Sequence, residues 1–259
     1  MKNLFLTICF GTVLWLCTAG FAADKAPAER TAKKGKPTYV IVHGAWGGGW
    51  SFKQLDQLLS ARGYKVYRPS LTGQGERVHL ASPTIDLETH ITDVVNLILW
   101  EDLHDIVLVG HSYGGMVITG VADRVPDRIR HVVYLDAFVP ENGESVAAIR
   151  GTIGGQPIVT NGFVKPPWAN PTDPIPHDVP HPVQTLLQPI TLTNQTAARA
   201  VPTTYVLTVD KGGKPEHDGF YPFYQRAVAR GWKTCLMEAD HNPQRSKPKE
   251  LAKLLMKIR

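Results

Sequence analysis

Ser112 lies at the centre of the chemically most informative stretch of the chain, Gly110-His111-Ser112-Tyr113-Gly114. An unbroken apolar run at 106–109 precedes this stretch, and a helix-like run begins at Gly115. Alone, the spacing G-x-S-x-G also fits a plain glycine-rich turn. Between a strand and a helix, the two glycines permit a sharp turn that exposes the serine hydroxyl at the helix N-terminus. We therefore predict that Ser112 is a nucleophile.

A serine hydroxyl is a weak nucleophile and needs a base, which in turn needs an orienting acid. His241 fits the base, because it follows a strand-like run at 235–239 and precedes a short loop and an amphipathic C-terminal run. A surface histidine in a basic tail is the alternative. The other histidines lack such a context. His177 and His181, in a proline-rich stretch, are expected to be solvated loop residues rather than metal ligands, because no cluster of carboxylates or cysteines accompanies them.

Five segments in chain order resemble α/β-hydrolases of the branch that holds plant methylesterases, hydroxynitrile lyases and small bacterial esterases. They lie at 43–50, 71–77, 110–117, 135–140 and 240–251, so the resemblance covers nearly all of the chain after residue 37. It implies that the base is carried on the loop after the last strand, where His241 lies. It also implies that the backbone N–H groups of Ala45 and Tyr113 form an oxyanion hole. Gly47, Gly48 and Gly49 keep the first loop small, or form a flexible turn.

Two aspartates remain candidates for the acid. Asp210 ends the strand-like run at 204–209, after which the fold usually keeps its acid, but the usual position a couple of residues further on is occupied by Gly212. Asp136 ends the preceding strand-like run, and a carboxylate there resembles the arrangement in some haloalkane dehalogenases. We prefer Asp136 and keep Asp210 as the alternative. Either could instead cap local backbone N–H groups.

The elements that must position these residues alternate between strand and helix, as in a parallel sheet. Strands are expected at 38–43, 65–69, 105–109, 129–135, 203–209 and 233–238. Helices are expected at about 50–62 and 87–100, from Gly115 to Val125, at about 220–230 and at the C-terminus. The predicted fold is an α/β-hydrolase fold: a mostly parallel sheet with helices on both faces and a Pro/Gly-rich cap insertion after strand 6 of that fold.

The expected organisation has five segments. Residues 1–22 read as an export signal, because Lys2 precedes an apolar run that ends in small residues; an uncleaved membrane anchor is the alternative. Residues 23–36 form a basic linker, 37–140 the first part of the core, 141–201 the cap and 202–259 the second part of the core. An unstructured excursion is the alternative to a cap. The expected location is periplasmic or secreted.

Composition agrees with one α/β domain. The chain has 259 residues, 43% of them hydrophobic, which excludes general disorder. Only Cys235 follows the proposed signal, so no internal disulfide is possible in the mature chain, and we expect Cys235 to lie in a buried strand. The positive charge lies in the tails: residues 24–36 carry five basic and two acidic groups and residues 241–259 six and one, whereas residues 37–240 have a net charge of −4 and Lys2 adds one positive charge to give +5 overall. We therefore expect no nucleic-acid partner.

These observations predict a cofactor-free, metal-free serine hydrolase that cleaves small carboxylic esters. A hydroxynitrile lyase or other C–C lyase on the same fold is the first alternative. In the family that chemistry relies on a threonine and a lysine at places that here hold Gly44 and Asn242. A noncatalytic binding protein is the second alternative, and it would require a broken triad. Trp46, Trp50 and Trp168 suggest an apolar pocket or simple packing.

Overall fold

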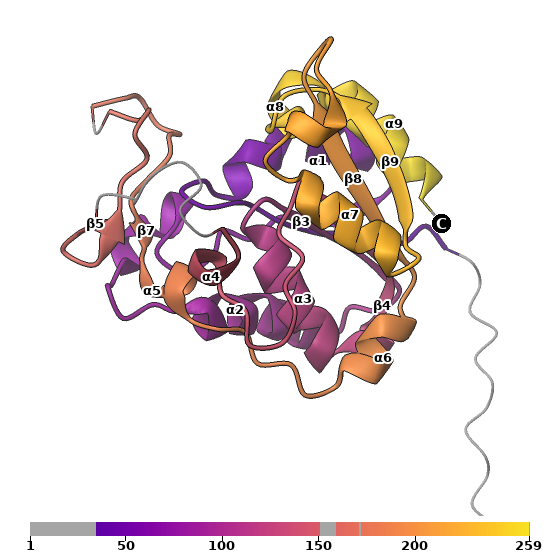
Figure 1. The fold of residues 1–259 in the computed structure, drawn as a ribbon, viewed down its shortest axis with the longest axis horizontal. Coiled ribbons are helices and arrows are strands. Elements are labelled where there is room, and N and C mark those ends of the chain that lie inside the picture. The colour runs from indigo at the N-terminus through magenta and orange to yellow at the C-terminus, as the bar shows by residue number, and fades with distance from the viewer. Residues whose placement is uncertain (1–34, 151–158, 171, 259) are drawn as a thin grey trace, which may run out of the picture. The chain divides into compact units, whose positions relative to one another are not determined.

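A six-stranded sheet forms the centre of the computed structural model, which describes residues 35–150, 159–170 and 172–258. The strand order is β2-β1-β3-β4-β8-β9, and every neighbouring pair is parallel (Figure 1). The predicted export signal and nearly all of the predicted basic linker lie outside the described residues. The strands are β1 (Thr38–Val42), β2 (Lys65–Tyr67), β3 (Ile106–His111), β4 (Ile129–Leu135), β8 (Thr203–Val209) and β9 (Lys233–Glu238).

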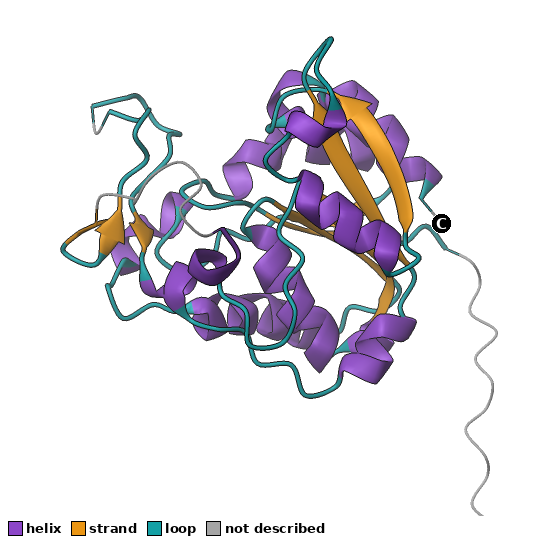
Figure 2. Ribbon diagram, viewed as in Figure 1, coloured by secondary structure: helices purple, strands orange, loops and turns teal. Residues whose placement is uncertain are grey.

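Helices cover both faces of this sheet (Figure 2). Alternate side chains of a strand point to opposite faces, so Val40 and Val42 of β1 enter one apolar cluster, whereas Tyr39 and Ile41 enter another. The first cluster contains the apolar sides of α2 (Leu87–Trp100), α3 (Gly114–Arg124) and α7 (Tyr221–Ala229). The second contains those of α1 (Lys53–Ser60) and α9 (Pro248–Lys257). The predicted α/β-hydrolase architecture is confirmed.

Most predicted elements of the core lie where the sequence places them. The strands at 129–135, 203–209 and 233–238 and the helix at 87–100 have the predicted bounds. The strand predicted at 65–69 ends earlier, at Tyr67, and the one predicted at 105–109 runs on to His111. The helix predicted at about 50–62 is divided into a 3-10 turn, η1 (Gly49–Phe52), and α1. Cys235 lies in β9 but is half-buried, because β9 is an edge strand.

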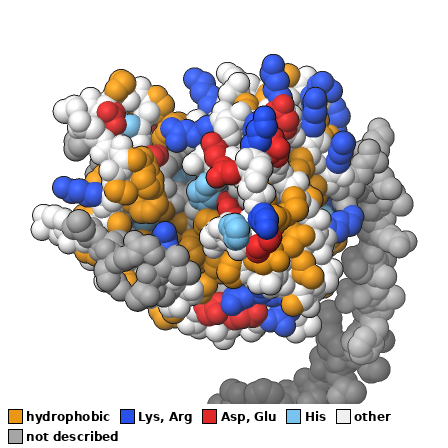
Figure 3. Space-filling model, turned by 45° about the horizontal axis from the view of Figure 1, so that its top comes forward, with side chains coloured by type: hydrophobic (Ala, Val, Ile, Leu, Met, Phe, Trp, Pro, Cys, Tyr) orange, Lys and Arg blue, Asp and Glu red, His pale blue; other side chains and the backbone are white. Residues whose placement is uncertain are grey.

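The segment predicted as a cap contains short elements and is not an unstructured excursion where it is described. Three two-residue strands, β5 (Val159–Thr160), β6 (Phe163–Val164) and β7 (His181–Pro182), form a small antiparallel sheet. Hydrophobic side chains gather on the surface of the molecule near this small sheet (Figure 3). The described residues of the segment also form three helices: α4 (Val146–Arg150), α5 (Gln184–Leu187) and α6 (Gln195–Ala200).

The expectation that His181 is solvated is wrong. Its side chain is fully buried, and its Nδ1 accepts the backbone N–H of Trp46 (3.3 Å), while its Nε2 lies 2.8 Å from the Thr185 hydroxyl. Burial lowers its pKa well below the usual value. The proline-rich context concealed this role, because the partners of His181 include a residue 135 positions away. His177, four residues earlier in the same stretch, is half-buried.

Buried neutral histidines make the fold sensitive to acid. Burial lowers the pKa of His43, His90 and His131 from 6.5 to about 4. The unfolded chain therefore binds more protons than the folded chain between pH 6.5 and pH 4, and stability falls as the pH is lowered through that window. We expect urea midpoints to decrease from pH 6.5 to 4. His131→Gln, far from Ser112, should weaken this pH dependence, and an unchanged slope would contradict the assignment.

Candidate active site

Ser112 occupies a sharp turn between β3, which ends at His111, and α3, which begins at Gly114. Its φ is +54°, in the left-handed region that serine seldom adopts. The turn is tied to the neighbouring strand, since the Ser112 N–H donates to Leu135 O (3.3 Å) and Ser112 O accepts the Phe138 N–H (3.1 Å). The strained backbone thus projects the hydroxyl beyond the carboxyl end of the sheet.

Gly110 and Gly114 were expected to supply a backbone flexible enough for the sharp turn at Ser112. The structure shows a different requirement for glycine at these two positions. Neither has a positive φ. A Cβ at Gly110 would lie 2.7 Å from the carbonyl oxygen of Gly114, and one at Gly114 would lie 2.6 Å from that of Val42. Both distances are too short for real contacts, so the glycines allow strand, turn and helix to approach closely. The unusual dihedral angle is carried by Ser112 itself.

His241 lies on the loop between β9 and α8 (Pro243–Ser246), and its imidazole faces Ser112. Its Nδ1–H donates to Asp136 Oδ2 (2.6 Å), because an ionised carboxylate can only accept. In the neutral ring, Nε2 is then the acceptor for the Ser112 hydroxyl, at 3.0 Å. A continuous hydrogen-bond chain therefore joins Asp136, His241 and Ser112, three residues from distant parts of the sequence.

Asp136 directly follows β4, and its side chain has no exposed surface. Its Oδ1 accepts the backbone N–H of Thr208 in β8 (3.0 Å), which leaves Oδ2 for the imidazole. The Asp136 N–H donates to Val206 O (2.7 Å), so the adjacent strand fixes the residue on two sides. Asp210, the alternative acid, is exposed one residue beyond the end of β8. Within the described residues its carboxylate makes no hydrogen bond to His241.

Three further residues around the imidazole were missed by sequence reasoning. The Phe220 ring stacks on that of His241, with centroids 4.8 Å apart and an interplanar angle of 11°. The buried His111 donates from Nε2 to the His241 carbonyl oxygen (2.7 Å) and so holds the loop. Burial first, and then the charge of Asp136, raises the pKa of Asp218. Of these three residues, only His111 could have been found from the sequence, because it directly precedes Ser112.

The loop after β1 lies directly over this turn. A Cβ at Gly44 would lie 2.9 Å from Ser112 Cβ and 3.2 Å from His111 Nδ1, so no larger residue fits there without movement. Ala45, next in the chain, lines the same cavity as Ser112. Within the described part of the chain, the backbone N–H groups of Ala45 and Tyr113 have no protein acceptor. Both remain available to a bound oxygen atom.

A cavity of about 370 Å³ opens above Ser112, within the usual range for small-molecule sites of about 300–1,000 Å³. Trp46 and Trp168 line it, with ring centroids 5.2 Å apart and planes at 81°. Trp50, the third tryptophan suggested by the sequence, does not line it; its ring lies under the Arg245 guanidinium. The walls are formed by the following residues: Gly44, Ala45, Trp46, Gly47, Ser51, His111, Ser112, Trp168, Asp178, His241, Asn242, Gln244 and Arg245.

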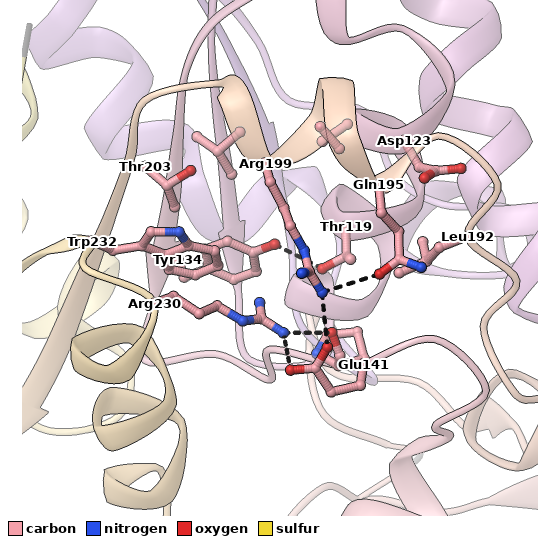
Figure 4. A pocket seen from close by; sticks show the side chains of 14 residues that line it. Thr119, Asp123, Tyr134, Glu141, Leu192, Gln195, Arg199, Thr203, Arg230 and Trp232 are labelled. Atoms are coloured by element: carbon pink, nitrogen blue, oxygen red, sulfur yellow. Dashed lines mark hydrogen bonds and ion pairs between the residues drawn. The ribbon is translucent and has the colours of Figure 1, made fainter.

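A second cavity, of about 40 Å³, lies apart from Ser112. Arg199 and Arg230 converge there on Glu141, and the ring of Tyr134 stacks on that of Trp232 (Figure 4). Its volume is far below that of ordinary ligand sites, and its arginines are already paired with a carboxylate. The chemistry-bearing residues therefore meet at the larger cavity.

The described residues contain no cluster of three or more His, Cys, Asp or Glu side chains suited to a metal ion. Across the same part of the chain, no helix has both the length and the apolar character needed to cross a bilayer.

Comparison with known proteins agrees with this architecture. Residues 39–254 match the model of the alpha/beta hydrolase family. An extracellular alpha/beta-hydrolase from a Paenibacillus species has a similar structure, with a TM-score of 0.68 and 25% sequence identity, covering 86% of this chain and 98% of that one. A methylesterase from Arabidopsis shares the fold, with a TM-score of 0.65 and 24% identity over 85% and 98% of the chains. The chain belongs to the alpha/beta hydrolase family.

Curated proteins match the sequence of this chain over shorter segments. The chain is 55% identical over 111 residues to a carbendazim hydrolyzing esterase from Nocardioides sp., over 43% of this chain and 46% of that protein. It is 35% identical over 113 residues to salicylic acid-binding protein 2 from Nicotiana tabacum, over 42% of each. The chain thus spans less than half the length of these curated relatives.

Proposed function

We propose that the protein is a serine hydrolase that cleaves small carboxylic esters through an acyl-enzyme intermediate. The observation that carries the proposal is the continuous hydrogen-bond chain from Asp136 through His241 to the Ser112 hydroxyl, at the floor of a ligand-sized cavity. The family and the esterase relatives support it.

In the proposed reaction the Ser112 oxygen attacks the ester carbonyl while His241 Nε2 takes its proton. The Ala45 and Tyr113 N–H groups stabilise the negative charge that develops on the carbonyl oxygen. The imidazolium then protonates the departing alcohol, and a water molecule, activated in the same way, hydrolyses the acyl-enzyme and restores Ser112. Asp136 keeps the imidazole in the tautomer that accepts from serine and stabilises the imidazolium. The segment 141–201 acts as the cap of the site, since Trp168 and Asp178 line its cavity.

The lyase alternative is disfavoured by the loop geometry. A threonine at position 44 would place its Cβ 2.9 Å from that of Ser112, so this loop does not accommodate the hydroxyl which that chemistry uses in related enzymes. Asn242 supplies no cation beside His241. A noncatalytic binding role would leave the complete hydrogen-bond chain and the free N–H donors without a purpose.

The proposed function is tested with purified protein and a panel of p-nitrophenyl and methyl esters of graded acyl length. Carbendazim and a pyrethroid belong in the panel, because relatives are named for hydrolysing them. We expect turnover of at least the short-chain esters, with one acid and one alcohol released per cycle. Absence of turnover across the panel by a folded protein would contradict the proposal.

Export is a separate proposal. If residues 1–22 are a signal, mass spectrometry of the exported protein should find its N-terminus at about Ala23 or Asp24. Recovery of the chain with intact Met1 from the cytosolic fraction would show that the segment is not cleaved.

A further inference from the structure

Asp178 places a carboxylate in the wall of the cavity above Ser112. Its Oδ2 accepts the indole N–H of Trp168 (2.8 Å). Among the described residues its Oδ1 has no hydrogen-bond donor, and the carboxylate forms no ion pair. A Cβ at Gly47 would lie 3.9 Å from Oδ1, so this oxygen lies beside the loop that carries Ala45. The proposed reaction does not use this carboxylate.

The position of Asp178 is fixed by its neighbours. The Val179 N–H donates to the carbonyl oxygen of Trp46 (2.8 Å), and the Trp46 N–H donates to the buried His181 (3.3 Å). The indole N–H of Trp46 donates to Val164 O in the small sheet (2.9 Å). Trp46 itself has a φ of +65°, which is unfavourable for a bulky residue and persists only where contacts enforce it. The residues that follow Asp178, Val179 and His181, are therefore attached to the Trp46 loop of the active site by two hydrogen bonds.

Two indole rings line the cavity together with this carboxylate, and one of them, Trp168, is hydrogen-bonded to it. Trp168 is 64% exposed although it is large and apolar, and it forms an edge-to-face pair with Trp46. The faces of indole rings attract cations, and a nearby carboxylate adds to that attraction. Arg245, the other charged residue of the cavity wall, has its guanidinium 5.0 Å from the ring centroid of Trp50. Asp178 and the two tryptophans thus combine negative potential with flat apolar surface.

We propose that Asp178, Trp46 and Trp168 form a specificity site for a protonated nitrogen on the ester substrate. The proposal rests on the proposed ester hydrolysis and adds the class of substrate: aromatic esters that carry an ammonium or amidinium group. Such a substrate would place its ring against the tryptophans and donate an N–H to Asp178 Oδ1. Its carbonyl group would lie over Ser112.

The test compares two nearly isosteric substrates, methyl 4-(aminomethyl)benzoate, which is protonated at pH 7, and methyl 4-ethylbenzoate, which is neutral. The 3-substituted pair is measured in parallel. We expect the wild-type kcat/KM to be higher for the ammonium ester. Asp178→Asn keeps an acceptor for the Trp168 N–H but removes the negative charge. In this variant the kcat/KM for the ammonium ester divided by that for the neutral ester should fall by about three- to tenfold, which is the effect of losing one partly exposed charge pair. Added salt should lower the wild-type ratio.

Asp173→Asn is the matched control, because Asp173 is an exposed aspartate of the same segment that accepts the Asn170 N–H and does not line the cavity. It should keep the wild-type ratio. Equal ratios in wild type and Asp178→Asn, with the neutral ester still hydrolysed, would overturn the specificity site and leave the proposed function intact. Failure of the wild type on all four esters and on the wider panel would overturn both. Thermal melting shows whether each variant is folded.

Discussion

Ser112→Ala should abolish ester turnover while leaving the fold intact. The change removes the only group that bonds covalently to the substrate in the proposed mechanism, and the small side chain of alanine fits wherever serine fits. By comparison with deletions in other serine-histidine-aspartate enzymes, kcat should drop about a thousandfold or more. Steady-state kinetics on the most rapidly hydrolysed ester of the panel measure the loss, and circular dichroism verifies folding. A near-normal rate from folded Ser112→Ala would remove the serine-hydrolase proposal altogether.

The same experiment extends to His241, since the hydroxyl and the imidazole act as a unit. His241→Ala should cause a loss similar to that of Ser112→Ala. The double variant should be little worse than either single variant, because the second change removes a group that no longer has a function. If the loss of activity in the double variant equalled the product of the two single losses, Ser112 and His241 would not act in the same step.

Asp136→Asn should also lower turnover by orders of magnitude, whereas Asp210→Asn should have little effect. The asparagine can still accept the Thr208 N–H at Oδ1, but its amide group next to His241 Nδ1 favours the wrong imidazole tautomer and no longer stabilises the imidazolium. Asp210 is exposed at the end of β8 and serves as the matched control. Parallel kcat measurements and melting curves separate a catalytic effect from unfolding. Equal activity of wild type and Asp136→Asn would exclude Asp136 as the acid.

Much of the fold was predictable because the information is local. A buried parallel strand reads as a short apolar run, as at 129–135, and an amphipathic helix as a 3.6-residue pattern, as at 87–100. The turn at Ser112 was also predictable, since strand, small residues and helix follow one another within a few positions. The bounds of β2 and η1 were less accurate, because hydrogen bonds to neighbouring elements decide where such short segments end.

The sequence favoured Asp136 over Asp210 as the acid but left both open. Both follow a strand, and only the pairing of β4 with β8, and of β8 with β9, brings Thr208 N and His241 Nδ1 to the two oxygens of Asp136. The role of His181 was hidden for the same reason, since its burial depends on Trp46 from another part of the chain. The middle segment carries no strong periodicity, and its two-residue strands form only through pairing with each other.

The sequence alone therefore determined the order of the core elements, the serine turn and the histidine after the last strand, because each depends on neighbours along the chain. Only the tertiary structure decided which carboxylate meets His241, how closely the Gly44 loop approaches Ser112, and that Asp178 faces the same cavity. Asp136 and His241 are 105 positions apart in the sequence, and Gly44 and Ser112 are 68 apart. The geometry of these contacts arises when the sheet and its covering segments pack, and no local pattern specifies it.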